Sequence, residues 1–511
     1  MVDLGTVVRP VSHVGSGGLY ALRNATTPAA SPWVVPLHLN QIVQPPPGAQ
    51  QLPNGSPVPV GDVLVVDPTA IAAGAHITVR MPDTYPAFPY GWVSWNDWLG
   101  RVSTMVNAVL QANAKGQTNI DGWELWNEPD GTWNATSAGA YLAGWTRTYQ
   151  AVRALDAKTP IVGPSYSHWD GNAMQSFLQN AQTTNTLPDV ICWHELSGWS
   201  HVTGDVQAYR ALETQLGISP RPISIDEYAQ TSEVDVPSAA NHYVAQFERT
   251  GVRDGERAFW YESGTINGLL YNGNPTGTYW MYSWYGDQTG NIVAVTPTAN
   301  NDGVAAYDAA ERRMILVFGG DSGTNYVTIN GVGAIDSTVT VTLKHTTSTG
   351  RMTNLAAPSV LSTTDYRVQG GNITVTVPNQ EAQGAYELIV TAQGGGTDAG
   401  ADSGGSNSNV GAGADGSGGG ELLDGASHGG SGGVDASHIP DDSGSNATDS
   451  ASGLPGHDAG CGCASVGLAS GRDGWIGAIV ACASLLAVGR GRRSHTRSRD
   501  RESSDRARHD A

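Results

Sequence analysis

The stretch Gly122–Asp130 ends a short apolar run in residues that can do acid–base chemistry. It reads Gly-Trp-Glu-Leu-Trp-Asn-Glu-Pro-Asp, and the run stops at Asn127–Pro129. Such a run, closed by a proline, predicts a buried strand that opens into a loop. The Glu128 carboxyl group could exchange a proton with a glycosidic oxygen, and the Asn127 amide could hold a sugar hydroxyl. Neighbouring indoles could stack on a sugar ring.

Cleavage of a glycosidic bond needs a second carboxyl group, because retaining and inverting enzymes both place one on each side of the bond. The best candidate is Glu227, which follows the strand-like segment Ile223–Ile225. Both acids therefore come directly after a strand, as catalytic residues do in a (β/α)₈ barrel. Asp226 is the rival, but strand alternation predicts that its side chain points to the other side.

The segments Trp126–Pro129 and Ile225–Tyr228 together resemble the motifs of clan A of the retaining glycoside hydrolases. In that clan the acid/base follows an asparagine on the fourth barrel strand, and the nucleophile ends the seventh. Trp193–Glu195, the aromatic segments after the nucleophile and a β-rich C-terminal part are similar to family 39 and its relatives. The resemblance extends over residues 10–392.

This resemblance implies roles for the two acids. Glu128 would be the general acid/base and Glu227 the nucleophile of a double displacement, while Asn127 would bind the sugar 2-hydroxyl. A negative Glu227 is expected to raise the pKa of Glu128 in the free enzyme by repulsion between like charges. The mechanism requires no metal ion and no organic cofactor.

Four further residues are candidates for contact with the substrate. His194 ends a predicted strand, and a substrate role and a hydrogen-bonded structural role are equal alternatives for it. Tyr228 is a weaker candidate. Trp260 and Trp280 compete as the platform on which a sugar stacks, and core packing is the alternative for either.

Glu124 lies deeper in the same strand as Glu128. A buried acid at this place is expected to pair with a cation such as Arg80 rather than to act in catalysis. Arg80 could also hydrogen-bond the nucleophile.

Strand and helix patterns alternate through the first part of the chain, which predicts a parallel α/β fold. The expected strands are Val14–Leu22, Ile77–Met81, Ile120–Glu128, Ile161–Pro164, Asp189–His194, Ile223–Glu227, Ala258–Tyr261 and Thr278–Tyr285. The expected helices are Trp95–Ala114, Ala138–Leu155, Met174–Gln182, Asp205–Leu216 and Asn241–Thr250. We therefore predict a (β/α)₈ TIM barrel over residues 1–291.

Beyond residue 291 the pattern changes to short strands separated by Gly, Asn, Asp and Ser. The strands are Met314–Phe318, Tyr326–Ile329, Val339–Lys344, Ile373–Val377 and Tyr386–Thr391. This pattern predicts a small all-β sandwich over residues 292–393. Structural support is its expected role, and carbohydrate binding is the alternative.

Residues 394–460 contain Gly, Ser, Ala and Asp but no Lys, Arg or aromatic residue. Such a segment cannot bury enough apolar surface to fold, so we expect a disordered acidic linker. It carries part of the net charge of −20 of the 511-residue chain. We interpret this acidity as an aid to solubility, and nothing basic in the expected folded region suggests nucleic acid.

Residues 461–511 begin with Cys-Gly-Cys, continue with the apolar run Trp475–Val488, and then carry the arginines of 490–493. The run is short for a membrane span, which needs about 20 residues. The order of these features resembles the myxobacterial C-terminal sorting signal. It implies transient anchoring in the inner membrane by the tail, followed by release to the cell surface by sorting and processing machinery. An ordinary single-span anchor is the alternative.

An exported protein should also begin with an export signal, but Met1–Gly5 is neither basic nor strongly apolar. Either the start of the reading frame is placed too late or the N-terminus has been trimmed.

We therefore predict a monomeric retaining glycoside hydrolase, exported to the cell surface or the medium. Its expected substrate is an extracellular polysaccharide or oligosaccharide of plant or microbial origin, with β-xylosidase-like exo action favoured. Two alternatives stay open. One is an endo-acting glycanase of the same clan, and the other is a non-catalytic surface protein that binds carbohydrate on a hydrolase scaffold.

Overall fold

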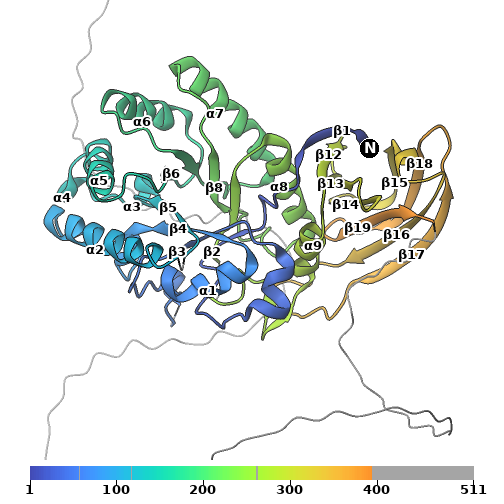
Figure 1. The fold of residues 1–511 in the computed structure, drawn as a ribbon, viewed down its shortest axis with the longest axis horizontal. Helices are drawn as coiled ribbons and strands as arrows, with labels where there is room; N and C mark the ends of the chain where they lie inside the picture. The colour runs from blue at the N-terminus through green and yellow to red at the C-terminus, as the bar shows by residue number, and fades with distance from the viewer. Residues whose placement is uncertain (57, 117, 261–262, 394–511) are drawn as a thin grey trace, which may run out of the picture. The chain divides into compact units, whose positions relative to one another are not determined.

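Eight parallel strands close into a barrel in this computed structural model, which describes residues 1–56, 58–116, 118–260 and 263–393. Figure 1 shows the barrel with its surrounding helices. The strands are β2 (Gly17–Leu19), β3 (Gln41–Gln44), β4 (His76–Arg80), β5 (Ile120–Glu124), β6 (Ile161–Tyr166), β7 (Val190–Trp193), β8 (Ile223–Tyr228) and β9 (Asp254–Arg257). The predicted TIM-barrel architecture is confirmed.

Helices follow most of these strands and cover the outside of the barrel. They are α1 (Val63–Ala73), α2 (Trp95–Asn113), α5 (Tyr141–Leu155), α6 (Gly171–Thr183), α7 (Val202–Leu216), α8 (Pro237–Thr250) and α9 (Gly277–Gly286), with the short α3 (Pro129–Thr132) and α4 (Ala135–Ala138). Side chains of Asp62, Ser94 and Asp170 cap α1, α2 and α6 by accepting hydrogen bonds from backbone amides of the first turn.

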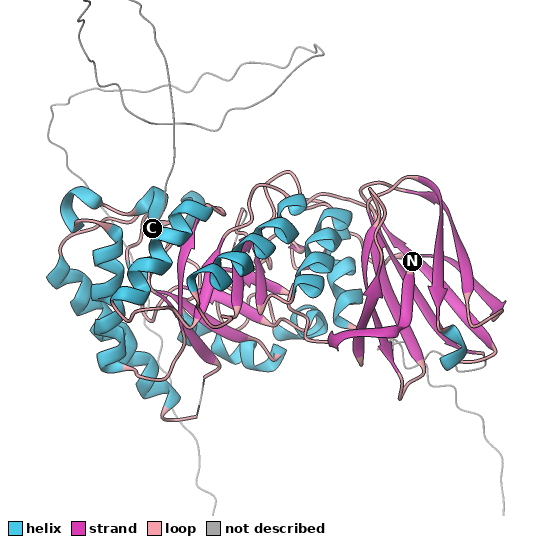
Figure 2. Cartoon of the chain, turned by 90° about the horizontal axis from the view of Figure 1, so that it is seen from above, coloured by secondary structure: helices cyan, strands magenta, loops and turns pink. Residues whose placement is uncertain are grey.

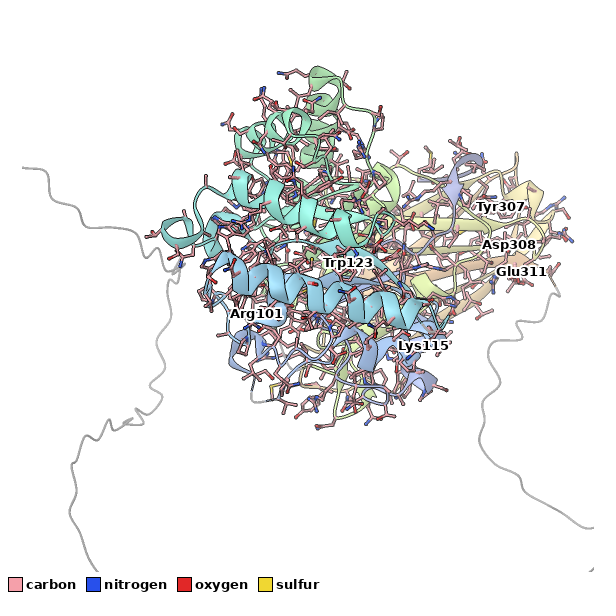
Figure 3. All side chains as sticks on the ribbon, turned by 60° about the vertical axis from the view of Figure 1, so that its left-hand side comes forward. Arg101, Lys115, Trp123, Tyr307, Asp308 and Glu311 are labelled. Carbon is pink, nitrogen blue, oxygen red and sulfur yellow. The ribbon has the colours of Figure 1, made fainter. Side chains whose placement is uncertain are left out.

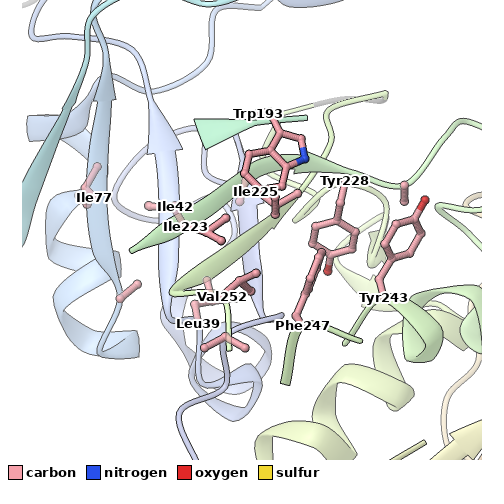
Figure 4. Packing of buried hydrophobic residues seen from close by; sticks show 14 of the residues in the cluster. Leu39, Ile42, Ile77, Trp193, Ile223, Ile225, Tyr228, Tyr243, Phe247 and Val252 are labelled. Carbon is pink, nitrogen blue, oxygen red and sulfur yellow. The ribbon is translucent and has the colours of Figure 1, made fainter. Parts of the chain in front are cut away.

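Helix α2 shows how such a helix lies on the barrel (Figure 3). Trp98, Val102 and Val109 are buried on one side of it, whereas Arg101 lies toward solvent. The same kind of apolar packing continues around β8, where Ile223, Ile225 and Phe247 lie close together (Figure 4). Because Ile223 and Ile225 point outward to this core, their neighbours on β8 are directed into the barrel.

The end of β8 departs from regular pairing. Its register with β9 shifts between Ile225 and Tyr228, which inserts an irregularity at Asp226 and Glu227. Such an irregularity redirects side chains from strict alternation. Two backbone bonds hold it in place, since Glu195 N donates to Glu227 O at 2.8 Å and Ala229 N donates to Glu195 O at 3.2 Å.

The C-terminal part of the described chain is a single nine-stranded sheet. Its order is β17-β16-β19-β14-β13-β12-β1-β15-β18. The strands are β1 (Val2–Pro10), β12 (Asn291–Val295), β13 (Asp302–Asp308), β14 (Arg313–Gly319), β15 (Gly323–Asn330), β16 (Thr338–Thr346), β17 (Ser359–Arg367), β18 (Ile373–Gln380) and β19 (Ala385–Ala392). Apolar residues from strands across the whole order share one core. The sheet domain thus encloses its core with one continuous sheet rather than with the two separate sheets expected of a sandwich.

The N-terminal strand β1 belongs to this sheet and not to the barrel. It pairs antiparallel with β12 and parallel with β15. The prediction that residues 1–291 form one barrel domain was therefore wrong for its first residues. The boundary near 291 coincides with the start of β12, while the linker and tail predicted for 394–511 lie outside the described residues.

The sheet domain packs on α8 and α9, which Figure 2 shows between barrel and sheet. Buried side chains on one side of this contact donate hydrogen bonds to backbone carbonyls on the other side. Asn241 Nδ2 donates to Asp302 O at 3.0 Å, Gln288 Nε2 donates to Val304 O at 3.0 Å, and Thr346 Oγ1 donates to Gly277 O at 2.7 Å. The interface is thus specified by directed hydrogen bonds as well as by apolar contact.

Two expected strands near the end of the barrel sequence were wrong. The aromatic segment Thr278–Tyr285 lies in α9, and Ala258–Trp260 follows β9 instead of forming it. In the part of the chain that the structure describes, no helix has the length and apolarity to cross a bilayer.

Candidate active site

Glu128 lies just beyond β5, directly before α3. Its backbone is left-handed (φ 48°), an unusual conformation for a residue with a Cβ that costs about 1–3 kcal/mol. The surrounding backbone enforces it, because Glu128 N donates to Ser165 O at 2.8 Å and Thr132 N donates to Glu128 O at 2.8 Å. This turn directs the carboxyl group over the end of the barrel rather than along the strand.

Glu227 is held by Arg80 from the end of β4. Arg80 Nη1 donates to Glu227 Oε1 at 2.5 Å, Nη2 donates to Asp226 Oδ2 at 3.0 Å, and Nε donates to Glu124 Oε2 at 2.7 Å. The predicted pairing of Glu124 with Arg80 is confirmed, as is the contact between Arg80 and the candidate nucleophile. Asp226 does not point to the opposite side from Glu227, because the irregular end of β8 brings both to one guanidinium.

The two candidate catalytic carboxyl groups face one another at the same end of the barrel. One carboxylate oxygen of Glu128, one of Glu227 and a ring nitrogen of His194 all lie within 4.8 Å of one another. The Glu128 and Glu227 side chains stay 18% and 12% exposed, so both open to solvent. The oxygens of this pair thus approach more closely than the about 6.5–9.5 Å that separates the carboxyl groups of inverting enzymes.

His194 connects these acids from the end of β7, where it is fully buried. Its Nδ1 lies 3.2 Å from Glu128 Oε1, and its Nε2 lies 3.2 Å from Asp226 Oδ1 and 3.8 Å from Glu227 Oε1. Burial acts to lower the pKa of His194, but the charges of Glu227 and Asp226 outweigh it and raise the pKa well above its usual value. The imidazole is thus a buried cation among carboxylates.

The pKa of Glu128 shifts in the opposite direction to the one expected from sequence. Burial acts to raise the pKa of Glu128, but the hydrogen bond from His194 and the charges of His194 and Arg80 hold it below its usual value. Burial raises the pKa of Glu227, and attraction to His194 and Arg80 offsets this only in part. The reason is His194, whose hydrogen bond and charge act directly on Glu128 and, with the charge of Arg80, outweigh burial and the repulsion from Asp226.

A cavity of about 190 Å³ opens above these acids. Its walls combine carboxylates and amides with aromatic rings, as ligand pockets combine a few polar groups with apolar surface. The lining residues are Leu19, Tyr20, Gln51, Pro53, Asn54, Arg80, Phe88, Asn127, Glu128, Leu196, Glu227, Phe259 and Trp260.

The structure brings some of the predicted substrate contacts to this cavity and leaves others away from it. Asn127 and Trp260 line it, whereas His194 lies behind Glu128 and Glu227. Tyr228 is fully buried and its hydroxyl contacts Gly15 O and Tyr282 Oη, so it has no access to substrate. Trp280 lies on α9 and donates to Leu355 O of the sheet domain.

The tryptophans next to Glu128 serve packing. Trp126 is buried and forms edge contacts with Trp98 and Trp133. Its Nε1 donates to Thr132 Oγ1, which in turn donates to Asn127 O. These indoles therefore support the loop that carries Glu128 and do not stack on a sugar.

Sequence reasoning missed the part of the cavity that comes from loops after β2, β3 and β4. Tyr20, Asn54 and Phe88 belong to it. Tyr20 directly follows the glycine-rich strand β2 at a strand end, and that position was the one available signal. The other two lie in long loops without any periodic pattern.

Glu128, His194 and Glu227 could together offer three ligand atoms to a metal ion. Their atoms already have partners of the protein's own. Arg80 forms an ion pair with Glu227, and His194 forms a hydrogen bond with Glu128. The arrangement therefore fits acid–base chemistry better than it fits a divalent cation.

Comparison with known proteins gives relatives for this chain. No protein-family model matches it. The solved structure of N2152 from Neocallimastix frontalis is 30% identical, with a TM-score of 0.72, and the match covers 76% of this chain and 98% of that one. The chain belongs to the same family as N2152.

Two curated relatives are named for their activities. A 3-O-alpha-D-galactosyl-alpha-L-arabinofuranosidase of Bifidobacterium longum subsp. longum is 28% identical, over 76% of this chain and 40% of its own length. A 3-O-beta-L-arabinopyranosyl-alpha-L-arabinofuranosidase of Bifidobacterium pseudocatenulatum is 25% identical, over 76% and 47%. The chain thus spans less than half the length of either relative. Both relatives are α-L-arabinofuranosidases by name.

The fold itself recurs in more distant solved structures. The family 39 enzyme from Xanthomonas axonopodis pv. citri has a TM-score of 0.58 at 15% identity, with 76% of this chain and 96% of that chain covered. Structural similarity at this sequence identity shows a shared barrel and sheet domain. The chemistry has to be argued from the residues of the site.

Proposed function

We propose that this protein is a retaining, exo-acting glycoside hydrolase that removes α-L-arabinofuranosyl units from an extracellular oligosaccharide or polysaccharide, and that it is a family 39-like enzyme. The observation that carries the proposal is that one carboxylate oxygen of Glu128 lies within 4.8 Å of one of Glu227, beneath an open cavity. Retaining enzymes place their carboxyl groups about 5–5.5 Å apart, and inverting ones about 6.5–9.5 Å.

In the first step Glu227 attacks the anomeric carbon. The guanidinium of Arg80, 2.5 Å from Glu227 Oε1, holds one oxygen of the carboxylate and leaves the other for the attack. The bond to the leaving oxygen breaks as Glu128 gives that oxygen a proton. A glycosyl ester on Glu227 and a free aglycone are the products.

The proton that Glu128 delivers is held jointly with His194 in the free protein. Because the pKa of Glu128 is lowered and that of His194 is raised, the proton of the pair rests on His194 Nδ1. It needs to move only across the 3.2 Å hydrogen bond to Glu128 Oε1 for the acid to be ready. Transfer to the leaving oxygen then leaves neutral His194 and ionised Glu128.

In the second step water hydrolyses the ester. Glu128, now a carboxylate, takes a proton from the water as it attacks the anomeric carbon, and Glu227 leaves as a carboxylate. Return of the proton to His194 restores the starting state. Two displacements give net retention of configuration.

The size of the cavity favours exo action over the endo alternative. At about 190 Å³ it is smaller than the ~300–1,000 Å³ of pockets for drug-sized ligands and fits one sugar ring. Aromatic walls from Phe88, Phe259 and Trp260 supply apolar faces for that ring. A polymer would therefore enter by one end.

The names of the curated relatives guide the choice of sugar. Both are α-L-arabinofuranosidases, and they differ in the sugar carried at O3. The unit that enters the cavity in this protein is then arabinofuranose, in place of the xylose that the sequence alone favoured. Substituents at O3 would extend through the cavity mouth.

A substrate screen tests this function. The full chain is assayed with 4-nitrophenyl α-L-arabinofuranoside, 4-nitrophenyl β-D-xylopyranoside, internally linked polysaccharides and arabinofuranosyl oligosaccharides with and without a 3-O-sugar. Release of arabinofuranosyl units from chain ends supports the proposal. Cleavage only within polymers points to the endo alternative, and binding of glycans with no hydrolysis of any of them points to the non-catalytic one.

We also propose export, with the tail of residues 461–511 as a transient inner-membrane anchor that sorting machinery processes. Support comes from the order of Cys461, Cys463, the apolar run and the arginines of 490–493. Fractionation of cells and detection of the barrel test it. Protein in the medium or on the cell surface supports export, whereas purely cytoplasmic protein contradicts it and removes the case for an extracellular substrate.

A further inference from the structure

Asp83 is a buried carboxylate beside the cavity. It has no role in the proposed cleavage of the glycosidic bond. It lies in η4 (Met81–Thr84), directly after β4, and is fully shielded from solvent. Two tyrosines converge on it, since Tyr20 Oη donates to Oδ2 at 2.7 Å and Tyr90 Oη donates to Oδ1 at 3.0 Å. The side-chain amide of Gln51 lies 3.3 Å from Oδ1.

Tyr90 connects this carboxylate to Asn127. Asn127 Nδ2 donates to Tyr90 Oη at 3.1 Å. A carboxylate can only accept hydrogen bonds, so the hydroxyl proton of Tyr90 must point to Asp83. The phenol oxygen then has only lone pairs to offer Asn127, and it can be approached only by the amino end of the amide.

The other end of the Asn127 amide is left without a protein partner. Asn127 Oδ1 is buried and accepts no hydrogen bond from the residues that the structure describes. Asn127 lines the same cavity as Glu128 and Glu227. A buried acceptor in this position can be satisfied by a hydroxyl of the sugar bound above it.

We propose that Asp83 is a positioning residue that acts through Tyr90 to orient the Asn127 amide, so that Oδ1 and not the amino group faces the substrate. The hydroxyl at Asn127 must then act as the donor. This inference rests on the proposed function, because it takes a sugar as the occupant of the cavity. We take this donor to be the sugar 2-hydroxyl. It is attached to the carbon next to the anomeric carbon, and the anomeric carbon is held between the two catalytic carboxyl groups.

The orientation depends on the charge of Asp83. Burial raises the pKa of Asp83 to about 7, while the charge of Arg80 and the hydrogen bonds from Tyr20 and Tyr90 lower it and Glu227 raises it. Above that pH the carboxylate fixes Tyr90 as described. If Asp83 is protonated or replaced by asparagine, the Tyr90 hydroxyl is free to donate to Asn127 Oδ1. The side-chain amide of Asn127 can then flip, so that its amino group faces the substrate. Measurements at about pH 8 therefore isolate the carboxylate form.

The test compares variants across two substrates, 4-nitrophenyl α-L-arabinofuranoside and its 2-deoxy analogue. Wild type is expected to lose at least about tenfold in kcat/KM on the analogue. In Tyr90→Phe and Asp83→Asn, kcat/KM on the parent substrate falls and the ratio between the two substrates shrinks to within about twofold. A merely structural role would lower both substrates equally, and a wild-type ratio in the two variants overturns the proposal.

Tyr85→Phe is the matched control. Tyr85 is equally buried, and its hydroxyl donates to Asp97 instead of Asp83. It should keep the wild-type ratio. Thermal melting of each variant shows whether it folds, and Tyr90→Phe carries the test if Asp83→Asn does not fold.

Failure of the proposed function is distinguishable from failure of this inference. If wild type hydrolyses no aryl glycoside, the function is wrong, and the orientation is read from the ¹⁵N side-chain signals of Asn127, assigned by their loss in Asn127→Asp. The amide protons should exchange faster with water in Tyr90→Phe and Asp83→Asn than in wild type or Tyr85→Phe. Equal exchange in all four overturns the inference.

Discussion

His194 Nδ1 lies 3.2 Å from Glu128 Oε1, and His194 is fully buried while Glu128 opens to the cavity. The contact joins a group with a raised pKa to one with a lowered pKa. It makes the acid/base proton a property of the pair, and it explains why Glu128 does not have the raised pKa that repulsion from Glu227 alone would produce.

Replacement of His194 should change stability in a pH-dependent way. The raised pKa means that the folded state binds a proton more tightly than the unfolded state, so the stabilisation is complete below the unfolded pKa of about 6.5. It is lost as pH rises through the folded pKa. His194→Gln should therefore lower the free energy of unfolding most at acid pH and least at alkaline pH. Denaturant unfolding across pH measures this.

The exposed His168 supplies the control for that series. It lies 3.6 Å from Asp130, with its side chain 56% exposed. His168→Gln should leave the pH dependence of unfolding as in wild type. A His194→Gln deficit that is constant with pH would contradict a buried imidazolium.

Arg80→Met should destabilise the fold by about 3–5 kcal/mol, because it leaves buried carboxylates without their cation. Arg80 binds Glu124, Asp226 and Glu227, and it is 1% exposed. Arg101→Met removes an ion pair with Asp97 at the surface and should cost less than about 1 kcal/mol. If urea unfolding showed equal losses of unfolding free energy in the two variants, the buried ion pairs of Arg80 would not stabilise the fold as described.

Deletion of Met1–Pro10 should destabilise the protein severely. The strand β1 lies inside the sheet order, between β12 and β15, and buries Val2 and Leu4 in the sheet core. Its loss leaves two unpaired strand edges and a gap in the core. Solubility and melting temperature of the shortened chain measure the effect, and wild-type values for both would show that β1 is dispensable.

Deletion of residues 394–511 should leave kcat and melting temperature nearly unchanged, because barrel, sheet and both candidate catalytic acids lie upstream. In the cell the same deletion should release the protein into the medium. Replacement of Cys461 and Cys463 by alanine should instead retain it in the inner membrane. A large fall in kcat on deletion would show that the tail takes part in the enzyme.

The features that could be predicted from sequence are those with a periodic pattern along the chain and the residues at the ends of strands. The barrel, the helices from Trp95 onward and the partnership of Glu124 with Arg80 all follow from periodicity and burial. Glu128 and Glu227 came together because parallel strands end at one rim of a barrel.

What the sequence could not give depends on long-range contact or on local irregularity. Aromatic residues in Thr278–Tyr285 fit a strand pattern, but packing between barrel and sheet makes them a helix. Tyr228 continues the motif of the nucleophile, yet the altered register of β8 turns it into the core. The pairing of β1 with a sheet almost three hundred positions away has no local signal.

Glu128→Ala should keep activity on substrates with a good leaving group, such as 4-nitrophenyl glycosides, and lose it on natural linkages. A good leaving group departs without a proton, so the acid is dispensable only for it. The ratio of kcat/KM between aryl and alkyl arabinofuranosides measures this. A uniform loss on both classes would argue that Glu128 does not act as the acid.

The most direct test of the account is rescue of Glu227→Ala by azide. Loss of the nucleophile should abolish turnover, and azide should enter the vacated space and attack the anomeric carbon once. The account predicts a glycosyl azide with inverted configuration, identified by ¹H NMR, while wild type yields a product of retained configuration. Absence of rescue together with an inverted wild-type product would contradict a double displacement through Glu227.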